Sequence, residues 1–286
     1  MPALDEWRSH YLRWNQQGIF PLPGEAEEQF CARAHLLASQ SREQQAPQAE
    51  RQAPQAALVV RKLFDIDPDW VPVTFCNQGL RPWEGGCLWC DEAPHIQLRK
   101  AFLRKERLFG LYAVQEVLAH EYVHAVRMPL NSRRFEEFFS YFTASRMRGG
   151  ALSFLRTAFG PLFQQPAEVL LLAIVFFCSL ILAPFFWYAP LIPIVLILAL
   201  LGRLACSWRI FWRCRTRLAE FLGDHAHTYA VMVRLLDREI AWLARAPREA
   251  VAPWIEEQKR ESLRWKIICE AYCHPPSDAL FSLATR

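Results

Sequence analysis

The sequence predicts an α+β protein in which a mostly helical domain with a small sheet is followed by two membrane-spanning helices and a helical C-terminal region. Two short runs of β-forming residues occur in the first half of the chain. Apolar residues recur at helical spacing after these runs and again near the C-terminus. Between them lie 33 consecutive uncharged residues. We therefore divide the chain into a domain over residues 1–168, a hairpin over 169–206 and a helical region over 207–286.

The composition is that of a folded protein and gives no sign of nucleic-acid binding. Of the 286 residues, 52% are apolar, which is enough to bury a core. The net charge of +4 is small and its 33 basic residues are dispersed among 29 acidic ones, so we expect no nucleic-acid partner. The N-terminal MPALDEWRSHYLRW lacks the apolar stretch of a secretory signal. The nine scattered cysteines are expected to be mostly free thiols in a reducing compartment.

The first domain is expected to contain two strands. The segment from Ser39 to Ala57 is rich in Gln and Ala and fits a surface loop or a weak helix broken at Pro47 and Pro54. After it, VPVTFC from Val71 to Cys76 and PHIQLRKAF from Pro94 to Phe102 are predicted to be short strands, because they combine β-branched and aromatic residues.

The segment LYAVQEVLAHEYVHAVR, residues 111–127, is predicted to form a helix that carries an H-E-x-x-H pattern. Residues four apart on a helix lie about 40° from each other around the axis, so His120 and His124 can reach one metal ion. Two such ligands leave room for a third and a water, as zinc requires. Glu121 falls on the apolar stripe, where burial should raise its pKa and suit it to act as a general base. The stripe comprises Leu111, Val114, Val117, Leu118, Tyr122 and Ala125.

The order of the strand from Pro94 to Phe102, a loop and this helix resembles that of the zincin metallopeptidases, in which an edge strand binds the peptide substrate above the motif helix. The resemblance covers about a third of the chain, roughly residues 71–148, and its specific element is the five-residue motif. It implies a bound Zn²⁺, hydrolysis of peptide bonds, His120 and His124 as metal ligands and Glu121 as the base.

A glutamate is expected as the third metal ligand, as in the gluzincins, because no histidine follows the motif at metzincin spacing. The segment FEEFFSYF, residues 135–142, comes after MPLNSRR, which suits a tight turn and a helix N-cap. A helix starting there would fold back beside the motif helix with Glu136 and Glu137 facing the metal. We prefer Glu137, because Ser140 at the third following position resembles the small residue of the gluzincin pattern.

A second candidate for the third ligand lies beyond the predicted hairpin. The segment RLAEFLGD resembles the R-x-x-E-x-x-A-D stretch of membrane-embedded gluzincins, with Gly223 in place of alanine. It would make Glu220 the ligand, with Asp224 orienting a zinc-bound histidine. Those enzymes normally have further spans before the motif, and this sequence has none there. His225 and His227 are the remaining alternatives.

The uncharged run from Val169 to Leu201 predicts a transmembrane hairpin. One span needs about 20 residues, so this run is too long for one untilted helix and long enough for two short ones. The turn is expected between Pro184 and Pro190, with Trp187 and Tyr188 at the far interface. Arginines precede and follow the run but are absent from its tip, so both termini are predicted to be cytoplasmic. The alternative is a buried helix pair in a soluble core.

The C-terminal region is predicted to be helical over 218–245 and 252–273, where apolar residues recur at helical spacing. Asp237, Arg238 and Glu239 are expected on a solvated helix face.

The cysteines suggest one further metal site. Cys87 and Cys90, with Cys76 and His95 nearby in sequence, could make a structural zinc site, but the spacing fits no standard zinc finger and we expect them to pack. Cys269 and Cys273, one helical turn apart, are expected to be buried thiols.

Together these features predict a membrane-anchored zinc peptidase whose catalytic domain, residues 1–168, lies in the cytoplasm and hydrolyses a peptide or protein substrate. Glu121 would act as the general base on a zinc-bound water, and Tyr141 would stabilise the oxyanion. The competing hypothesis is a non-enzymatic membrane protein that uses a zincin-like domain to bind a partner. An acid on an apolar stripe favours the enzyme, because a scaffold has no need of it.

Overall fold

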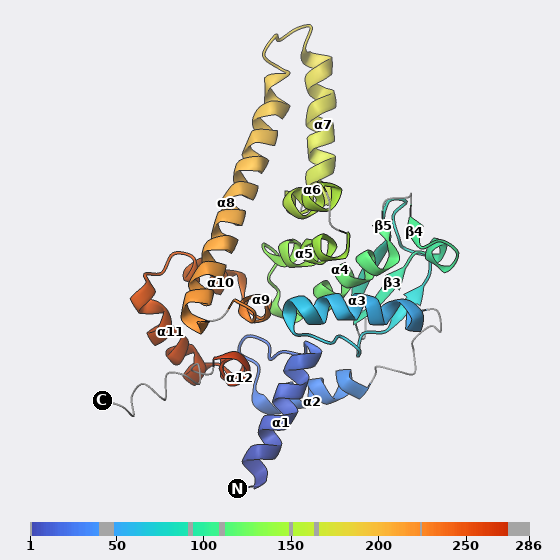
Figure 1. Cartoon of the computed structure of the whole chain (residues 1–286). Helices are drawn as coiled ribbons and strands as arrows, with labels where there is room; N and C mark the ends of the chain where they lie inside the picture. The colour runs from blue at the N-terminus through green and yellow to red at the C-terminus, as the bar shows by residue number, and fades with distance from the viewer. Residues whose placement is uncertain are drawn as a thin grey trace.

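The computed structural model describes residues 2–39, 49–90, 94–108, 112–148, 151–162, 166–223 and 225–273. These residues are mostly helical and include a three-stranded and a two-stranded sheet, which confirms the predicted α+β class. Figure 1 shows the helices α7 and α8 projecting side by side from a body that holds the strands and the other helices.

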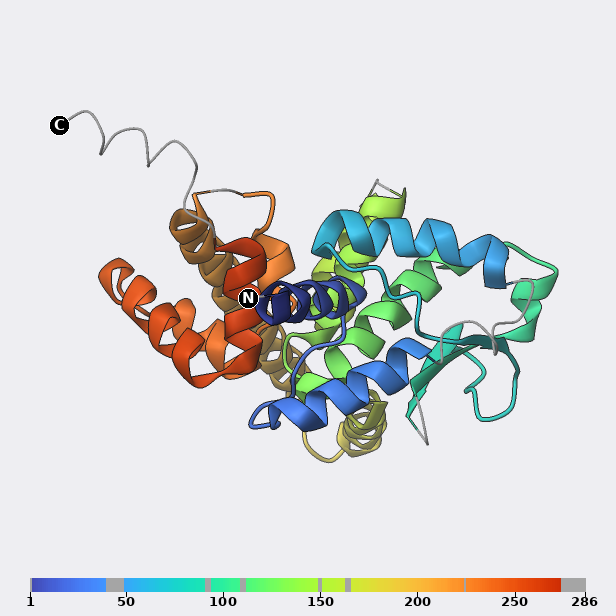
Figure 2. The same cartoon turned by 90° about the horizontal axis from the view of Figure 1, so that it is seen from below.

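Three helices form the N-terminal part: α1 (Pro2–Gln17), α2 (Glu27–Ser39) and α3 (Ala49–Phe64). Residues 49–57, which we expected in a loop or a weak helix, belong to α3, while 40–48 lie outside the described residues. Viewed from below, α1 lies beside the C-terminal helix α12, and the strands lie on the opposite side of the body (Figure 2). The helix α3 packs along the motif helix.

The main sheet contains one strand more than predicted. Its strands are β1 (Val73–Phe75), β2 (Gly86–Cys90) and β3 (Pro94–Leu98), in the order β1-β3-β2. The strand β1 is parallel to β3, and β2 is antiparallel to it. The expectation that the strand beginning at Pro94 forms the edge is therefore wrong, because β2 covers its outer side. The side chains of Ile96 and Leu98 are accordingly fully buried.

The predicted strand from Pro94 to Phe102 also ends early. After Leu98 the chain turns into the 3-10 helix η1 (Lys100–Leu103). Arg99 holds this turn, since its backbone N–H donates to the Gly85 carbonyl at 2.9 Å and its side chain donates to the Glu84 carbonyl at 2.8 Å. A short hairpin of β4 (Arg107–Leu108) and β5 (Tyr112–Ala113) then leads into the motif helix.

The motif helix α4 (Val114–Arg127) lies between the sheet, α3 and α5 (Glu136–Arg148). The turn that joins α4 to α5 includes the 3-10 helix η2 (Met128–Leu130). Arg127 at the end of α4 is fully buried and donates to the Val233 carbonyl at 2.6 Å. This hydrogen bond joins the motif helix to the C-terminal region.

The C-terminal region contains more breaks than predicted. The helix expected over 218–245 is divided, because α8 ends at Leu222 and Gly223 takes a left-handed conformation with φ of 67°. The helix expected over 252–273 is also interrupted, at Ser262. Glu239 is buried and pairs with Arg264 at 2.6 Å, so its expected place on a solvated face is wrong. The helices here are α9 (Thr228–Met232), α10 (Asp237–Leu243), α11 (Arg248–Glu261) and α12 (Leu263–Tyr272).

The uncharged run covers most of α7 (Pro166–Leu182) and the first part of α8 (Leu191–Leu222), two helices that run antiparallel to each other (Figure 1). The second is a continuous helix that is long and apolar enough to cross a membrane. The first satisfies the same criterion only together with the preceding α6 (Ala151–Phe159) and η3 (Gly160–Leu162), to which it is bent by 80°.

Apolar side chains cover the outside of these two helices. Only 17% of the apolar window of α8 is buried, whereas the core helix of a soluble domain is mostly buried. On α7, Leu170 is 62% exposed and Phe177 is 64% exposed, and Trp187 at the tip is 83% exposed. An exposed apolar area of this kind marks a membrane or protein interface.

Candidate metal centre

The motif helix α4 presents its two histidines and its glutamate toward a cleft beside the sheet. The helix forms because apolar residues line one face, and Val114, Leu118 and Ala125 of that face are fully buried. His120 and His124 are half-buried and line the cleft. Glu121 also lines the cleft and is only 9% exposed, as its place on the apolar stripe predicts.

The turn after α4 brings α5 back beside the histidines. Asn131 takes a left-handed conformation with φ of 47°, which asparagine tolerates better than most residues. The carboxylate of Asp237 then accepts hydrogen bonds from the backbone N–H groups of Arg134 at 2.7 Å and Phe135 at 3.3 Å. Asp237 of the C-terminal region therefore anchors the backbone just before α5, a role that the sequence did not reveal.

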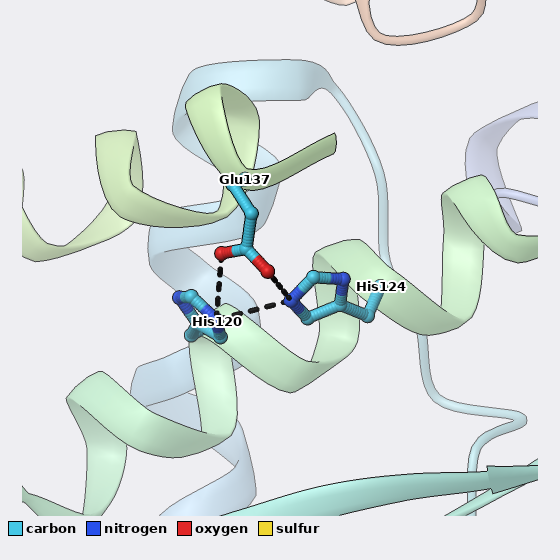
Figure 3. Close-up of side chains that lie close together, drawn as sticks. All are labelled: His120, His124 and Glu137. Atoms are coloured by element: carbon cyan, nitrogen blue, oxygen red, sulfur yellow. Dashed lines mark hydrogen bonds and ion pairs between the residues drawn. The ribbon is translucent and has the colours of Figure 1, made fainter. Parts of the chain in front are cut away.

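Glu137, in the first turn of α5, lies next to both histidines. The Nε2 atoms of His120 and His124 are 3.0 Å apart. The Glu137 carboxylate oxygens lie 3.6 Å from His120 Nε2 and 3.5 Å from His124 Nε2 (Figure 3). Ligand atoms around a tetrahedral zinc ion at about 2.0–2.1 Å are about 3.3 Å from one another. The three side chains thus have the separation and the donor types of a His-His-Glu zinc site.

Neighbouring groups orient both imidazole rings. Glu136 Oε1 lies 2.8 Å from Nδ1 of His124. His120 has a hydrogen bond to the backbone carbonyl of Ser140. Partners of this kind select the tautomer that leaves the other ring nitrogen available to a metal. The two adjacent glutamates are therefore distinct, because Glu136 positions a histidine while Glu137 faces the point where the imidazoles converge.

The electrostatics of the centre follow from its burial. Burial raises the pKa of Glu121 to about 7, although the nearby His124 opposes the change. Burial also raises the pKa of Glu137 and lowers that of His120. Burial would lower the pKa of His124 too, but the hydrogen bond with Glu136 and the surrounding carboxylates raise it to about 9. The cluster thus attracts a cation and holds one buried carboxylate that titrates near neutral pH.

Tyr141 borders the same cleft. Its ring lies edge-on to His120, with the ring centroids 4.8 Å apart. Gly160 makes room for it, since a Cβ atom there would come within 2.5 Å of the Tyr141 ring. Burial raises the pKa of Tyr141, so the phenol keeps its proton and can act as a hydrogen-bond donor.

The cleft that contains these groups has a volume of about 600 Å³. The edge strand β2 borders it through Gly86 and Cys87, and the exposed Trp83 lies at its rim. The strand β2 was not predicted, although glycines such as Gly85 and Gly86 often mark a strand residue that another segment approaches closely. A Cβ atom on Gly86 would lie 3.0 Å from the side chain of Val117 on α4.

The other predicted ligands lie away from this group. Glu220 forms ion pairs with Arg217 at 3.3 Å and Arg248 at 2.6 Å on the surface. His225 and His227 are exposed. Asp224 lies outside the described residues. Within the described part of the chain, His120, His124 and Glu137 are the one group with metal-binding geometry.

The C-x-x-C segment lies in β2, where it cannot chelate one ion in the usual way. Residues three apart in a strand point to opposite faces, so Cys87 lines the cleft while Cys90 contacts Met128, with the sulfur atoms 2.8 Å apart. Burial raises the pKa of Cys87 to about 11. The thiols of Cys269 and Cys273 form a hydrogen bond with each other.

Comparisons of the chain with protein-family models, with curated proteins and with solved structures find no match.

Proposed function

We propose that this protein is a membrane-embedded zinc metallopeptidase that hydrolyses peptide bonds of a polypeptide substrate at the cytoplasmic face. The observation that carries the proposal is Glu121, a buried carboxylate that borders the His120, His124 and Glu137 cluster without belonging to it. Two nitrogen ligands and one oxygen ligand from facing helices are a common catalytic zinc donor set, and a separate acid beside them is the further group that hydrolysis requires.

The side chains have distinct roles in this mechanism. A bound Zn²⁺ supplies Lewis acidity toward the attacking water and the scissile carbonyl. Glu121 accepts a proton from the water and passes it to the leaving amine, and a pKa near 7 suits both transfers. Tyr141 keeps its proton and donates a hydrogen bond to the developing oxyanion. Glu136 holds the His124 ring in place throughout.

The edge strand β2 offers a binding surface for an extended peptide. The Gly85 carbonyl bonds to Arg99 across the sheet, and in an antiparallel ladder alternate residues face the partner. Gly86 and Leu88 therefore turn their backbone groups outward, and the Leu88 N–H reaches Glu121. A substrate strand added here would run beside the catalytic carboxylate.

Both α7 and α8 cross the membrane in this proposal, and both termini lie in the cytoplasm. The apolar surface of both helices supports this placement. Arg203 of α8 pairs with Glu168 at the start of α7 at 2.6 Å, which fits a polar boundary at the cytoplasmic side. The tip between the helices contains no lysine or arginine, as expected for the far side.

The test combines metal analysis with hydrolysis of a peptide library by the full chain in detergent. The wild type should bind one zinc ion and cleave, whereas Glu121→Gln should keep the zinc and lose cleavage, because an amide cannot accept the proton. His120→Ala should lose both. If the wild type binds zinc but cleaves no library member, the peptidase is rejected in favour of a binding protein. If Glu121→Gln cleaves as the wild type does, the base is misassigned.

A further inference from the structure

The cleft at the metal centre reaches the membrane helix α7. Its lining includes Val169, Leu170 and Ala173, from the first turns of α7, together with the metal-binding group and Glu121. The cleft therefore has a wall that belongs to the apolar helix pair and not to the body of the protein.

The helix α6, which precedes α7 in the chain, is bonded to the metal centre. Arg156 of α6 pairs with Glu116 of the motif helix at 2.7 Å and stacks on Tyr112 at 4.3 Å. Thr157 donates a hydrogen bond to the carbonyl of Tyr141 at 3.1 Å. These bonds join α6 directly to the elements of the metal centre. The base of α7 is joined to α8, because Glu168 pairs with Arg203.

The two ends of the cleft differ in polarity. A second part of the depression shares His120, Glu121 and Tyr141 with the first. Its lining also includes Glu116 and Arg156, which form a partly buried ion pair. One part of the depression therefore holds this ion pair and the other holds the apolar residues of α7, with the metal centre between them.

The apolar wall continues along α7 as an exposed stripe. Leu170, which lines the cleft, is followed on the same helical face by Ile174, Phe177 and Ile181, at intervals of four, three and four residues. These three side chains are 50%, 64% and 70% exposed. One face of α7 thus leads from the hydrocarbon region into the metal centre without interruption.

We propose that the substrates are integral membrane proteins, cut in the cytoplasmic segment directly adjoining a transmembrane helix that packs on this face of α7. The inference rests on the peptidase function proposed above. The substrate helix would contact the stripe from Leu170 to Ile181, and the chain leaving the membrane would enter the cleft at its apolar end. Hydrolysis adds one water across the peptide bond, so a new carboxylate stays on one fragment and a new amine on the other.

Tethering to the membrane gives such a substrate a kinetic advantage. A segment joined to a span that docks on α7 reaches the centre at an effective concentration of about millimolar for a short linker. A free peptide of the same sequence has only its own contacts with the cleft. The proposal therefore predicts a large difference in kcat/KM between the two forms.

The experiment uses the full chain, loaded with zinc and reconstituted in phosphatidylcholine vesicles. The probe is a randomised peptide library, supplied either free or joined to a Leu-Ala helix of about 20 residues that spans the bilayer. Joined members should be cleaved at least about tenfold faster than the same free sequences. Leu170→Asn should remove most of that advantage. Leu171→Asn is the matched control, because Leu171 is similarly exposed, at 55%, but does not line the cleft.

Cross-linking tests the docking independently of turnover. Photoreactive benzoylphenylalanine in place of Leu170 should cross-link to the joined helix in zinc-loaded Glu121→Gln protein, and the same label in place of Leu171 should do so at least about tenfold less. Equal cleavage of free and joined members would overturn the substrate class and leave the peptidase intact. If neither the free nor the joined library members are cleaved, the proposed peptidase function is rejected. The absence of cross-links specific to position 170 would overturn the docking on α7.

Discussion

Replacing Glu121 with glutamine should stabilise the zinc-stripped protein at neutral pH. The carboxylate is 9% exposed, and its burial is the main reason that its pKa rises from 4.5 to about 7. The folded state therefore binds this proton more tightly than the unfolded state. The contribution of Glu121 to the free energy of unfolding must fall as pH rises from about 4.5 to about 7 and level off above that range. The difference between these two pKa values is worth about 3 kcal/mol.

Glutamine has the same shape and no charge, so the Glu121→Gln protein should not show this loss. This loss of stability is measured as a change in melting temperature, by thermal unfolding of chelator-treated protein in detergent at about pH 4 and about pH 8. A free-energy change of 1 kcal/mol shifts the melting temperature of a large domain by about 2–4 °C. The variant should therefore melt about 6–12 °C above the wild type at the higher pH and at the same temperature at the lower pH.

The exposed Glu257→Gln makes the same chemical change at the surface and is the control. A difference between wild type and Glu121→Gln that is equal at both pH values would refute the burial argument. A variant that melts below the wild type at about pH 8 would show instead that a favourable partner holds the Glu121 carboxylate charged.

Three further predictions concern the metal and the membrane. Glu137→Gln should weaken zinc affinity, measured by equilibrium dialysis, tenfold or more, as about 10–100-fold losses are typical around such centres. Glu136→Gln should weaken it to a similar or smaller extent, and Glu220→Gln should leave it unchanged. Zinc binding at about pH 7.5 should release close to one proton, since His124 has a pKa of about 9 and must lose its proton to bind; calorimetry in buffers of different ionisation enthalpy measures the number. A cysteine in place of Trp187 should react with an impermeant thiol reagent from outside intact cells, and labelling only after lysis would reverse the topology.

Local patterns in the sequence were sufficient for several parts of this structure. The four-residue spacing of His120 and His124, and the place of Glu121 on the apolar stripe, follow from the helical repeat alone. The turn after the motif helix follows from residues that favour turns. The choice of Glu137 was an inference from a resemblance, and the contact with both histidines supports it.

Other parts depend on contacts between segments that are distant in the sequence. The central place of β3 depends on β2 pairing to its outer side, and a register between strands leaves no local pattern. Asp237 binds the backbone just before α5 from 102 and 103 positions further along the chain. The end of α8 at Leu222 reflects a left-handed glycine and the packing of the helices that follow. The periodicity of apolar residues predicts which face of a helix is buried, but not which other element covers that face.

The residues that make the metal centre are therefore partly visible in the chain and partly not. Helical geometry acts over four residues, so the histidine pair and the buried acid are consequences of local order. Glu136 lies beside His124 Nδ1, and Glu137 lies next to both imidazoles. These separate positions depend on how α5 packs on α4. Leu170 contributes to the cleft because the start of α7 lies beside the metal centre in the folded chain. Packing between helices is set by the sum of many weak contacts, and no short stretch of sequence contains that sum.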